Sequence, residues 1–134
     1  MRYIIDTNVF IDFIEGRPIS KKVWQILEDK ENLIYVCSES IREFIHLVQL
    51  GKITPKTKDF DIFYFVEDEL GYGIKYVAKE HLRTLAKLPI ISDHKDQRDR
   101  LIISQAITEK IPLISSDKQF PKYRTLGLDF IPNY

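Results

Sequence analysis

The stretch that decides the fold is residues 1–12, MRYIIDTNVFID, in which an aspartate directly follows an apolar pair. Residues 3–5 are aromatic or β-branched and favour a β-strand that enters a core. Asp6 ends this run, and the small polar residues Thr7 and Asn8 suit a turn or a helix cap. The carboxylate of Asp6 is therefore predicted where a strand stops and a loop begins, which is where α/β folds carry functional side chains.

The rest of the chain alternates strand and helix patterns. Strands are predicted at residues 2–6, 33–36, 74–77, 112–115 and 129–131. Helices are predicted at residues 9–15, 20–29, 39–50, 79–87 and 98–110, and the aromatic and acidic stretch 59–70 is assigned to a helix because of its length. Strands separated by helices pair in parallel through right-handed crossovers. We therefore predict an α/β, Rossmann-like fold, a helix–sheet–helix sandwich around a central, mainly parallel sheet of about five strands.

Composition and charge limit the classes of function. The 134 residues contain no repeat or linker, so a single domain over residues 1–134 is predicted. No apolar run suits a membrane span and no signal-peptide pattern is present, so a cytoplasmic protein is expected. The 20 basic and 20 acidic residues cancel, which argues against indiscriminate nucleic-acid binding but not against a specific RNA partner. The single cysteine, Cys37, lies in an apolar stretch and is expected to be a buried, inert thiol.

Four acids are predicted to meet at one edge of the sheet. Asp6 ends the first strand, and Glu43 lies in the first turns of the helix after the second strand. Asp99 opens the helix that leads into the fourth strand, and Asp117 follows that strand. Because strand ends and the starts of the following helices share an edge in this topology, these four side chains should converge.

Such a convergence of acids needs a counter-charge. Two carboxylates about 4 Å apart repel by roughly 4 kcal/mol at an effective dielectric constant near 20. A ligand set made of carboxylates alone suits the hard cations Mg²⁺ or Mn²⁺. The histidines are not predicted as ligands. His46 and His81 are placed on helix surfaces, and His94 in a loop within reach of a bound phosphate.

Each acid also has a structural explanation. Glu43 completes a capping box with Ser40, and Asp99 stands three residues after Asp96 in a similar arrangement at a helix start. Asp6 could serve only as a helix cap, and Asp117 only as a turn residue. The predicted convergence of all four favours a shared site over four separate structural roles.

Four stretches carry a family resemblance: IIDTNVFID at the start, SESIREF in the middle, DQRDRLIISQA, and PLISSDKQF near the end. In this order, and covering the chain nearly end to end, they resemble the PIN-domain ribonucleases and, among them, the VapC-type toxins of prokaryotic toxin–antitoxin pairs. The resemblance implies a PIN-like fold and hydrolysis of RNA phosphodiester bonds with Mg²⁺ or Mn²⁺. It also implies a small antitoxin partner that covers the acidic cleft, and a homodimer.

The resemblance assigns roles residue by residue. It makes Asp6, Glu43, Asp99 and Asp117 the metal-binding, catalytic acids, with Asn8, Asp96 and Ser115 as supporting positions. The chain departs from the family where many relatives carry proline and phenylalanine between the two acids, since Gln97 and Arg98 stand there. The candidates for binding RNA phosphates are the basic residues near the third and fourth acids, although a solvated charged face explains them equally well: Lys95, Arg98, Arg100, Lys118, Lys122 and Arg124.

Three other classes of protein are considered. A catalytically silent PIN-like domain that binds RNA or another partner would keep the same fold. A phosphatase of the haloacid dehalogenase class needs a second aspartate two residues after the first, and Asn8 stands there. A receiver domain needs an aspartate at the end of its third strand, and residues 74–77 have none.

Overall fold

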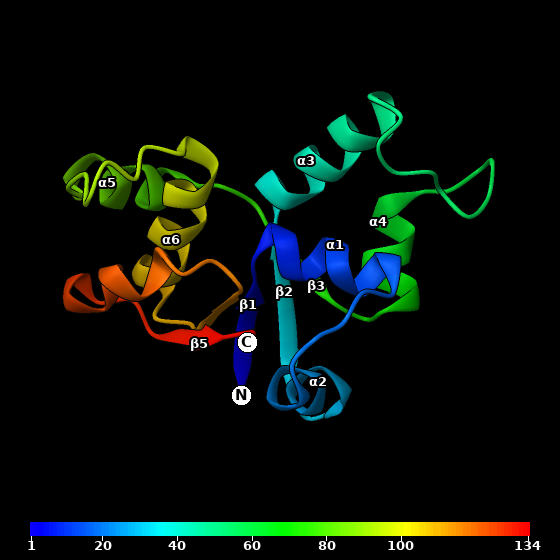
Figure 1. The fold of residues 1–134 in the computed structure, drawn as a ribbon, viewed down its shortest axis with the longest axis horizontal. Coiled ribbons are helices and arrows are strands. Elements are labelled where there is room, and N and C mark those ends of the chain that lie inside the picture. The colour runs from blue at the N-terminus through cyan, green and yellow to red at the C-terminus, as the bar shows by residue number, and fades with distance from the viewer.

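A five-stranded parallel sheet forms the centre of the computed structural model, which describes residues 1–134 (Figure 1). The strands lie in the order β3-β2-β1-β4-β5, and every neighbouring pair is parallel. They are β1 (Arg2–Ile5), β2 (Leu33–Cys37), β3 (Gly73–Lys75), β4 (Leu113–Ser115) and β5 (Phe130–Pro132). The predicted α/β sandwich with a parallel sheet of about five strands is confirmed.

Helices connect the strands and cover both faces of the sheet. They are α1 (Thr7–Glu15), α2 (Lys21–Glu28), α3 (Ser38–Gln49), α4 (Ile62–Tyr64), the π-helical turn η1 (Phe65–Glu69), α5 (Lys79–Lys87), α6 (Gln97–Glu109) and the 3₁₀ helix η2 (Phe120–Leu126). Figure 1 shows α5 and α6 on one side of β1, and α1, α3 and α4 on the other. None of these helices combines the length and the apolar character that a bilayer crossing requires.

The two consecutive isoleucines of β1 anchor two separate cores, because neighbouring side chains of a strand point to opposite faces. Ile5 packs with Phe10 of α1 and Phe44 of α3. Ile4 packs on the other face, in a cluster that includes Ile102 of α6. Both isoleucines are fully buried. The same strand therefore fixes the positions of α1, α3 and α6, whose N-terminal ends carry the predicted site.

The aromatic and acidic stretch 59–70 is helical, as predicted, but its helix begins only at Ile62. The Asp61 carboxylate starts it by accepting a hydrogen bond of 2.9 Å from the Phe63 N–H. The helix widens into the π-helical turn η1 before it ends at Glu69. The 3₁₀ helix η2 lies in a stretch for which no element was predicted.

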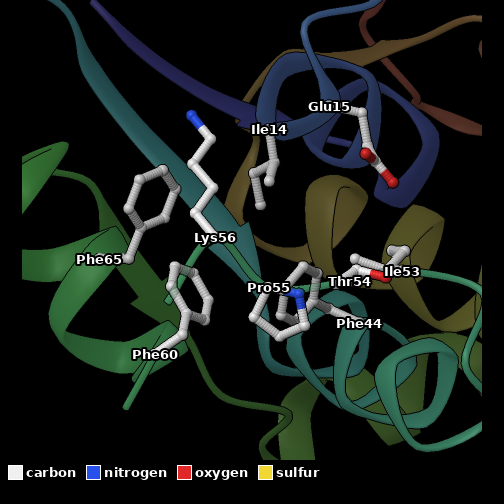
Figure 2. Close-up of a pocket in the computed structure, with 9 residues that line it drawn as sticks. All are labelled: Ile14, Glu15, Phe44, Ile53, Thr54, Pro55, Lys56, Phe60 and Phe65. Carbon is white, nitrogen blue, oxygen red and sulfur yellow. The ribbon is translucent and has the colours of Figure 1, made fainter. Parts of the chain in front are cut away.

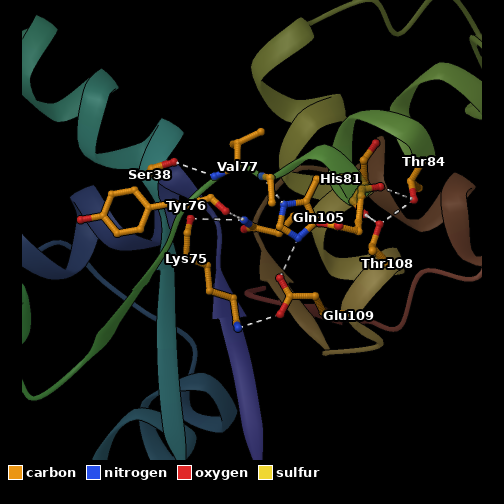
Figure 3. A network of polar contacts seen from close by, with 12 residues as sticks. Ser38, Lys75, Tyr76, Val77, His81, Thr84, Gln105, Thr108 and Glu109 are labelled. Atoms are coloured by element: carbon orange, nitrogen blue, oxygen red, sulfur yellow. Dashed lines mark hydrogen bonds and ion pairs between the residues drawn. The ribbon is translucent and has the colours of Figure 1, made fainter.

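His81 does not lie on a helix surface, and this expectation is wrong. The residue is 5% exposed, because its side of α5 packs against α6. Its Nδ1 accepts a hydrogen bond of 2.9 Å from the Ala78 N–H, and its Nε2 lies 2.8 Å from Glu109 Oε2. Lys75 Nζ binds the other oxygen of Glu109 at 2.7 Å. Figure 3 shows how this network joins β3, α5 and α6.

Candidate active site

Asp6 lies at the carboxyl end of β1 and is only 2% exposed. Its Oδ1 accepts a hydrogen bond of 2.8 Å from the Thr7 N–H and so caps α1, while its Oδ2 accepts one of 2.7 Å from the Ser115 hydroxyl. Burial raises the pKa of Asp6 to about 7, and the charges of Asp99 and Asp117 act in the same direction against the two hydrogen bonds. The role as a helix cap is real, but it leaves an acid buried beside two others.

Asp99 lies in the first turn of α6, one turn beyond the residue that caps this helix. Asp96 is the cap, since its carboxylate accepts a hydrogen bond of 2.9 Å from the Asp99 N–H. The Asp99 carboxylate is therefore not needed for capping, and its Oδ2 lies 3.2 Å from His94 Nε2. Burial, followed by the charge of Asp96, raises the pKa of Asp99 above its ordinary value, whereas the hydrogen bond from His94 opposes the shift.

Asp117 follows β4 and is held by its own turn. Its N–H donates a hydrogen bond of 3.0 Å to Ser115 Oγ, and its Oδ1 accepts one of 2.8 Å from the Gln119 N–H. Ligand atoms of Asp117, Asp99 and His94 all lie within 4.8 Å of one another. The turn after β4 thus places Asp117 beside Asp99, which lies at the start of α6.

Glu43 has no capping function, because α3 begins earlier than the sequence pattern suggested. The cap is Cys37, whose Sγ accepts a hydrogen bond of 3.5 Å from the Glu39 N–H. Ser40 instead lies within the helix, fully buried, with its hydroxyl 2.7 Å from that of Thr7. Glu43 is left free to pair with Arg98, whose Nη1 lies 2.7 Å from its Oε2.

A polar cleft of about 180 Å³ opens between the starts of α1, α3 and α6. Among the predicted residues it brings together three of the four acids, the exposed Asn8, Asp96 and one basic candidate. Asp117 lies outside its lining, beyond Asp99. The lining residues are Asp6, Thr7, Asn8, Ile11, Glu43, Leu47, Asp96, Arg98 and Asp99.

The structure places the six basic candidates in different surroundings, and only Arg98 lines the cleft. Arg98 lines the cleft and faces Glu43. Arg100 was a candidate for binding phosphate, but it is 5% exposed, and its guanidinium donates to the backbone carbonyls of Leu88 and Pro89 at 2.8 and 3.0 Å. Arg100 therefore holds the loop before α6 rather than reaching solvent.

The remaining four basic candidates do not line the cleft. Arg124 donates a hydrogen bond of 3.2 Å to the carbonyl of Phe130, the first residue of β5, so its guanidinium lies towards the opposite edge of the sheet. The three lysines are exposed, and each has a neighbouring partner at the surface. Lys95 lies 3.5 Å from Asp93, Lys118 lies over the ring of Tyr134, and Lys122 donates to Gln119.

Sequence reasoning missed one residue at this site. His94, assigned only to a loop, reaches Asp99 with Nε2 and lies 2.7 Å from the Tyr123 hydroxyl with Nδ1. Its position five residues before an acid at a helix start was visible in the sequence. What the sequence did not show was Tyr123, which belongs to the unpredicted helix η2.

A second hollow lies on the far side of Phe44, among α1, α3 and the segment before α4. Figure 2 shows the rings of Phe44, Phe60 and Phe65 around it, with Pro55 between them. Only Glu15 and Lys56 among its lining residues are charged, and its volume is about 60 Å³. This small, mainly apolar hollow contains one acid, Glu15, and no group of converging carboxylates, so the acidic cleft is the candidate site.

Comparisons with known proteins agree with this fold. The family model of the PIN domain matches residues 3–126. VapBC2 from Rickettsia felis, solved bound to a DNA fragment from its promoter, has a similar fold, with a TM-score of 0.73, 23% identity and 98% of each chain covered. VapBC-1 from nontypeable Haemophilus influenzae gives a TM-score of 0.67 at 18% identity, again with 98% of each chain covered. No curated protein is significantly similar in sequence. A family model that spans all four acids, from Asp6 to Asp117, shows that the chain belongs to the PIN domain family.

Proposed function

We propose that this PIN domain is a metal-dependent endoribonuclease that hydrolyses RNA phosphodiester bonds, with Mg²⁺ or Mn²⁺ as its cofactor. The observation that carries the proposal is the placement of Asp6 and Asp99, which lie far apart in the sequence, against one cleft. Each acid has a pKa raised by burial and by neighbouring acids. This is an arrangement that a fold does not need for its own stability.

The residues of the cleft fit a divalent cation. No lysine or arginine forms an ion pair with Asp6, Asp99 or Asp117, although two of these acids are largely buried. Carboxylate oxygens are the ligands that Mg²⁺ and Mn²⁺ prefer. Asp6, Asp99 and Asp117 would hold the cation, and Glu43 would complete the acidic set.

The other residues of the cleft would position the substrate and the acids. When bound, a divalent cation would neutralise charge on the phosphate and lower the pKa of an attacking water. The Ser115 hydroxyl and the Thr7 N–H hold the two oxygens of Asp6 in place. Arg98 is the basic side chain that lines the cleft, and its guanidinium could bind both Glu43 and a phosphate of the RNA. The exposed Asn8 amide would offer a hydrogen bond to the same RNA.

We further propose that the protein acts in the cytoplasm as the toxin of a type II toxin–antitoxin pair, as a homodimer. The fold that it shares with VapBC2 and VapBC-1 supports this assignment. Its partner would be a small antitoxin whose arginine or lysine enters the cleft beside Asp6 and Asp99. A basic side chain there would supply the counter-charge that the acids lack.

Cleavage of a structured RNA tests the enzymatic proposal. The purified protein should cut RNA in the presence of Mg²⁺ or Mn²⁺ and lose this activity in EDTA. Asp6→Asn and Asp99→Asn should each abolish cleavage. Asp12→Asn is the matched control. Asp12 lies on α1, the helix that Asp6 caps, but outside the cleft, and its Oδ1 is 3.4 Å from Arg17 Nη1. RNA binding without any metal-dependent cleavage would favour the catalytically silent module instead.

A further inference from the structure

We infer that His94 is a nitrogen ligand of the divalent cation, through Nε2, and that the ligand set is therefore not made of carboxylates alone. The inference deepens the proposed function and rests on it, because it concerns the same cation. The other ligands nearest to His94 would be Asp99, at the start of α6, and Asp117, in the turn after β4. The chain has only three histidines, and His94 alone among them is hydrogen-bonded to one of the four acids.

The distances around His94 suit shared ligation. Its Nε2 lies 3.2 Å from Asp99 Oδ2, and the ligand atoms of His94, Asp99 and Asp117 all lie within 4.8 Å of one another. Neighbouring ligands of an octahedral cation, each at about 2.1 Å and at right angles, are separated by about 3.0 Å. The three side chains need little movement to share one ion.

The imidazole ring is held in place from behind. Its Nδ1 lies 2.7 Å from the hydroxyl of Tyr123, a residue that is fully buried. The ring also lies edge-on to Tyr123 and close to Phe120, with centroid separations of 5.6 and 6.1 Å. Only 9% of the His94 side chain is exposed. A surface histidine would have no such support, whereas metal-binding histidines typically have a hydrogen bond on the second ring nitrogen.

The Tyr123 hydroxyl permits both protonation patterns of the ring, because a hydroxyl can donate or accept. With the proton on Nε2, His94 donates to Asp99 and Tyr123 donates to Nδ1. With the proton on Nδ1, His94 donates to Tyr123, and the lone pair of Nε2 faces the two acids. The second pattern is the one that a cation requires, and it costs no hydrogen bond at Tyr123.

A nitrogen ligand changes which cation is preferred. Mg²⁺ takes oxygen ligands almost exclusively. Mn²⁺, a first-row transition-metal ion, also accepts an imidazole nitrogen, although oxygen ligands remain its preferred set. The ligand set with His94 therefore favours Mn²⁺ over Mg²⁺ more strongly than four carboxylates would.

Electron spin echo envelope modulation of the Mn²⁺-loaded protein, purified without a histidine tag, tests the inference directly. The wild type should show modulation from a coupled ¹⁴N nucleus. Labelling its histidines with ¹⁵N should replace that modulation, without any mutation that could disturb folding. His94→Gln should lose the modulation and bind Mn²⁺ about 10- to 100-fold more weakly in calorimetry. Its affinity for Mg²⁺ should fall less. His46→Gln, at an exposed histidine of α3, should change neither measurement.

The outcomes separate the two proposals. Mn²⁺ binding without nitrogen modulation, or modulation that persists in His94→Gln, would overturn the role of His94 and leave the acidic nuclease site intact. A complete lack of Mn²⁺ and Mg²⁺ binding by the wild type would instead refute the metal-dependent function on which the inference rests.

Discussion

The hydroxyl of Ser115 donates a hydrogen bond of 2.7 Å to Oδ2 of Asp6, across the edge between β4 and β1. The same hydroxyl accepts the N–H of Asp117 at 3.0 Å. One buried side chain therefore fixes two of the candidate acids, which lie at the ends of neighbouring parallel strands. Because its bond to Asp6 favours the ionised acid, Ser115 also prepares that carboxylate to bind a cation.

Ser115→Ala should weaken Mn²⁺ binding by about 10- to 100-fold, because it removes the group that orients Asp6. It should also lower the free energy of unfolding by about 1–3 kcal/mol, since a buried carboxylate loses a partner. Calorimetric titration and thermal unfolding measure the two effects. Ser115→Thr retains a hydroxyl and should preserve most of the affinity. Equal metal affinity in wild type and Ser115→Ala would contradict the orienting role.

The raised pKa of Asp6 predicts an unusual pH dependence in EDTA. The pKa is about 7 in the folded protein, whereas an unfolded aspartate titrates near 3.8. The folded state therefore binds the proton more tightly, so this stabilising contribution is present at about pH 4 and is lost as the pH rises to about 7. The loss amounts to about 4 kcal/mol, at about 1.4 kcal/mol for each pKa unit. Urea unfolding across this range should show a steeper decline for wild type than for Asp6→Asn. Parallel curves would count against the burial of an ionisable Asp6.

Replacement of Arg98 by alanine should change mainly the activity, whereas replacement of Arg100 should change mainly the stability. Arg98→Ala should change the stability by less than about 1 kcal/mol, because its ion pair with Glu43 is partly exposed. It should lower kcat/KM for RNA and reduce the dependence of log(kcat/KM) on log salt concentration by about one unit.

Arg100→Ala should instead lower the free energy of unfolding by about 2–4 kcal/mol, because the Leu88 and Pro89 carbonyls lose a charged donor. The salt dependence of the folded variant should match that of wild type. Chemical unfolding and cleavage assays at several salt concentrations check both variants. A large change in salt dependence for Arg100→Ala would show that this buried residue reaches the RNA after all.

The network around Glu109 in Figure 3 should stabilise the protein mainly above acidic pH. Burial alone would raise the pKa of Glu109, but the hydrogen bonds from Lys75 and His81 and their charges outweigh it and lower that pKa. The stabilising contribution is therefore present above the unfolded pKa of about 4.5 and is lost as the pH falls through the lower pKa of the folded state. Glu109→Gln should destabilise the protein by about 1–3 kcal/mol at pH 7, and by less at pH 4. Glu67→Gln, at an exposed position on η1, is the control for urea unfolding and should have little effect.

The fold could be predicted largely from local pattern. The alternation of strand-prone and helical stretches was sufficient for the parallel sheet, and β1 and α5 appear close to where the sequence places them. The spacing of apolar residues and their helix or strand propensities predict such elements, because both depend on only a few neighbouring residues. The helix η2 was missed because it is short and irregular, and its aromatic residues are buried by packing against α6 and β5.

Only those features of the site that follow from the topology of the sheet could be predicted from the sequence. The rule that strand ends share an edge was sufficient to bring Asp6 and Asp99 together. It was not sufficient for His81, Arg100 and His94, whose surroundings come from segments distant in the sequence. The sequence by itself determined the layered fold and the edge at which the acids gather, because both follow from short-range periodicity and chain connectivity. Only the tertiary structure decided which charged side chains are buried and which partner each one meets, because hydrogen bonds and desolvation depend on contacts between residues far apart in the chain.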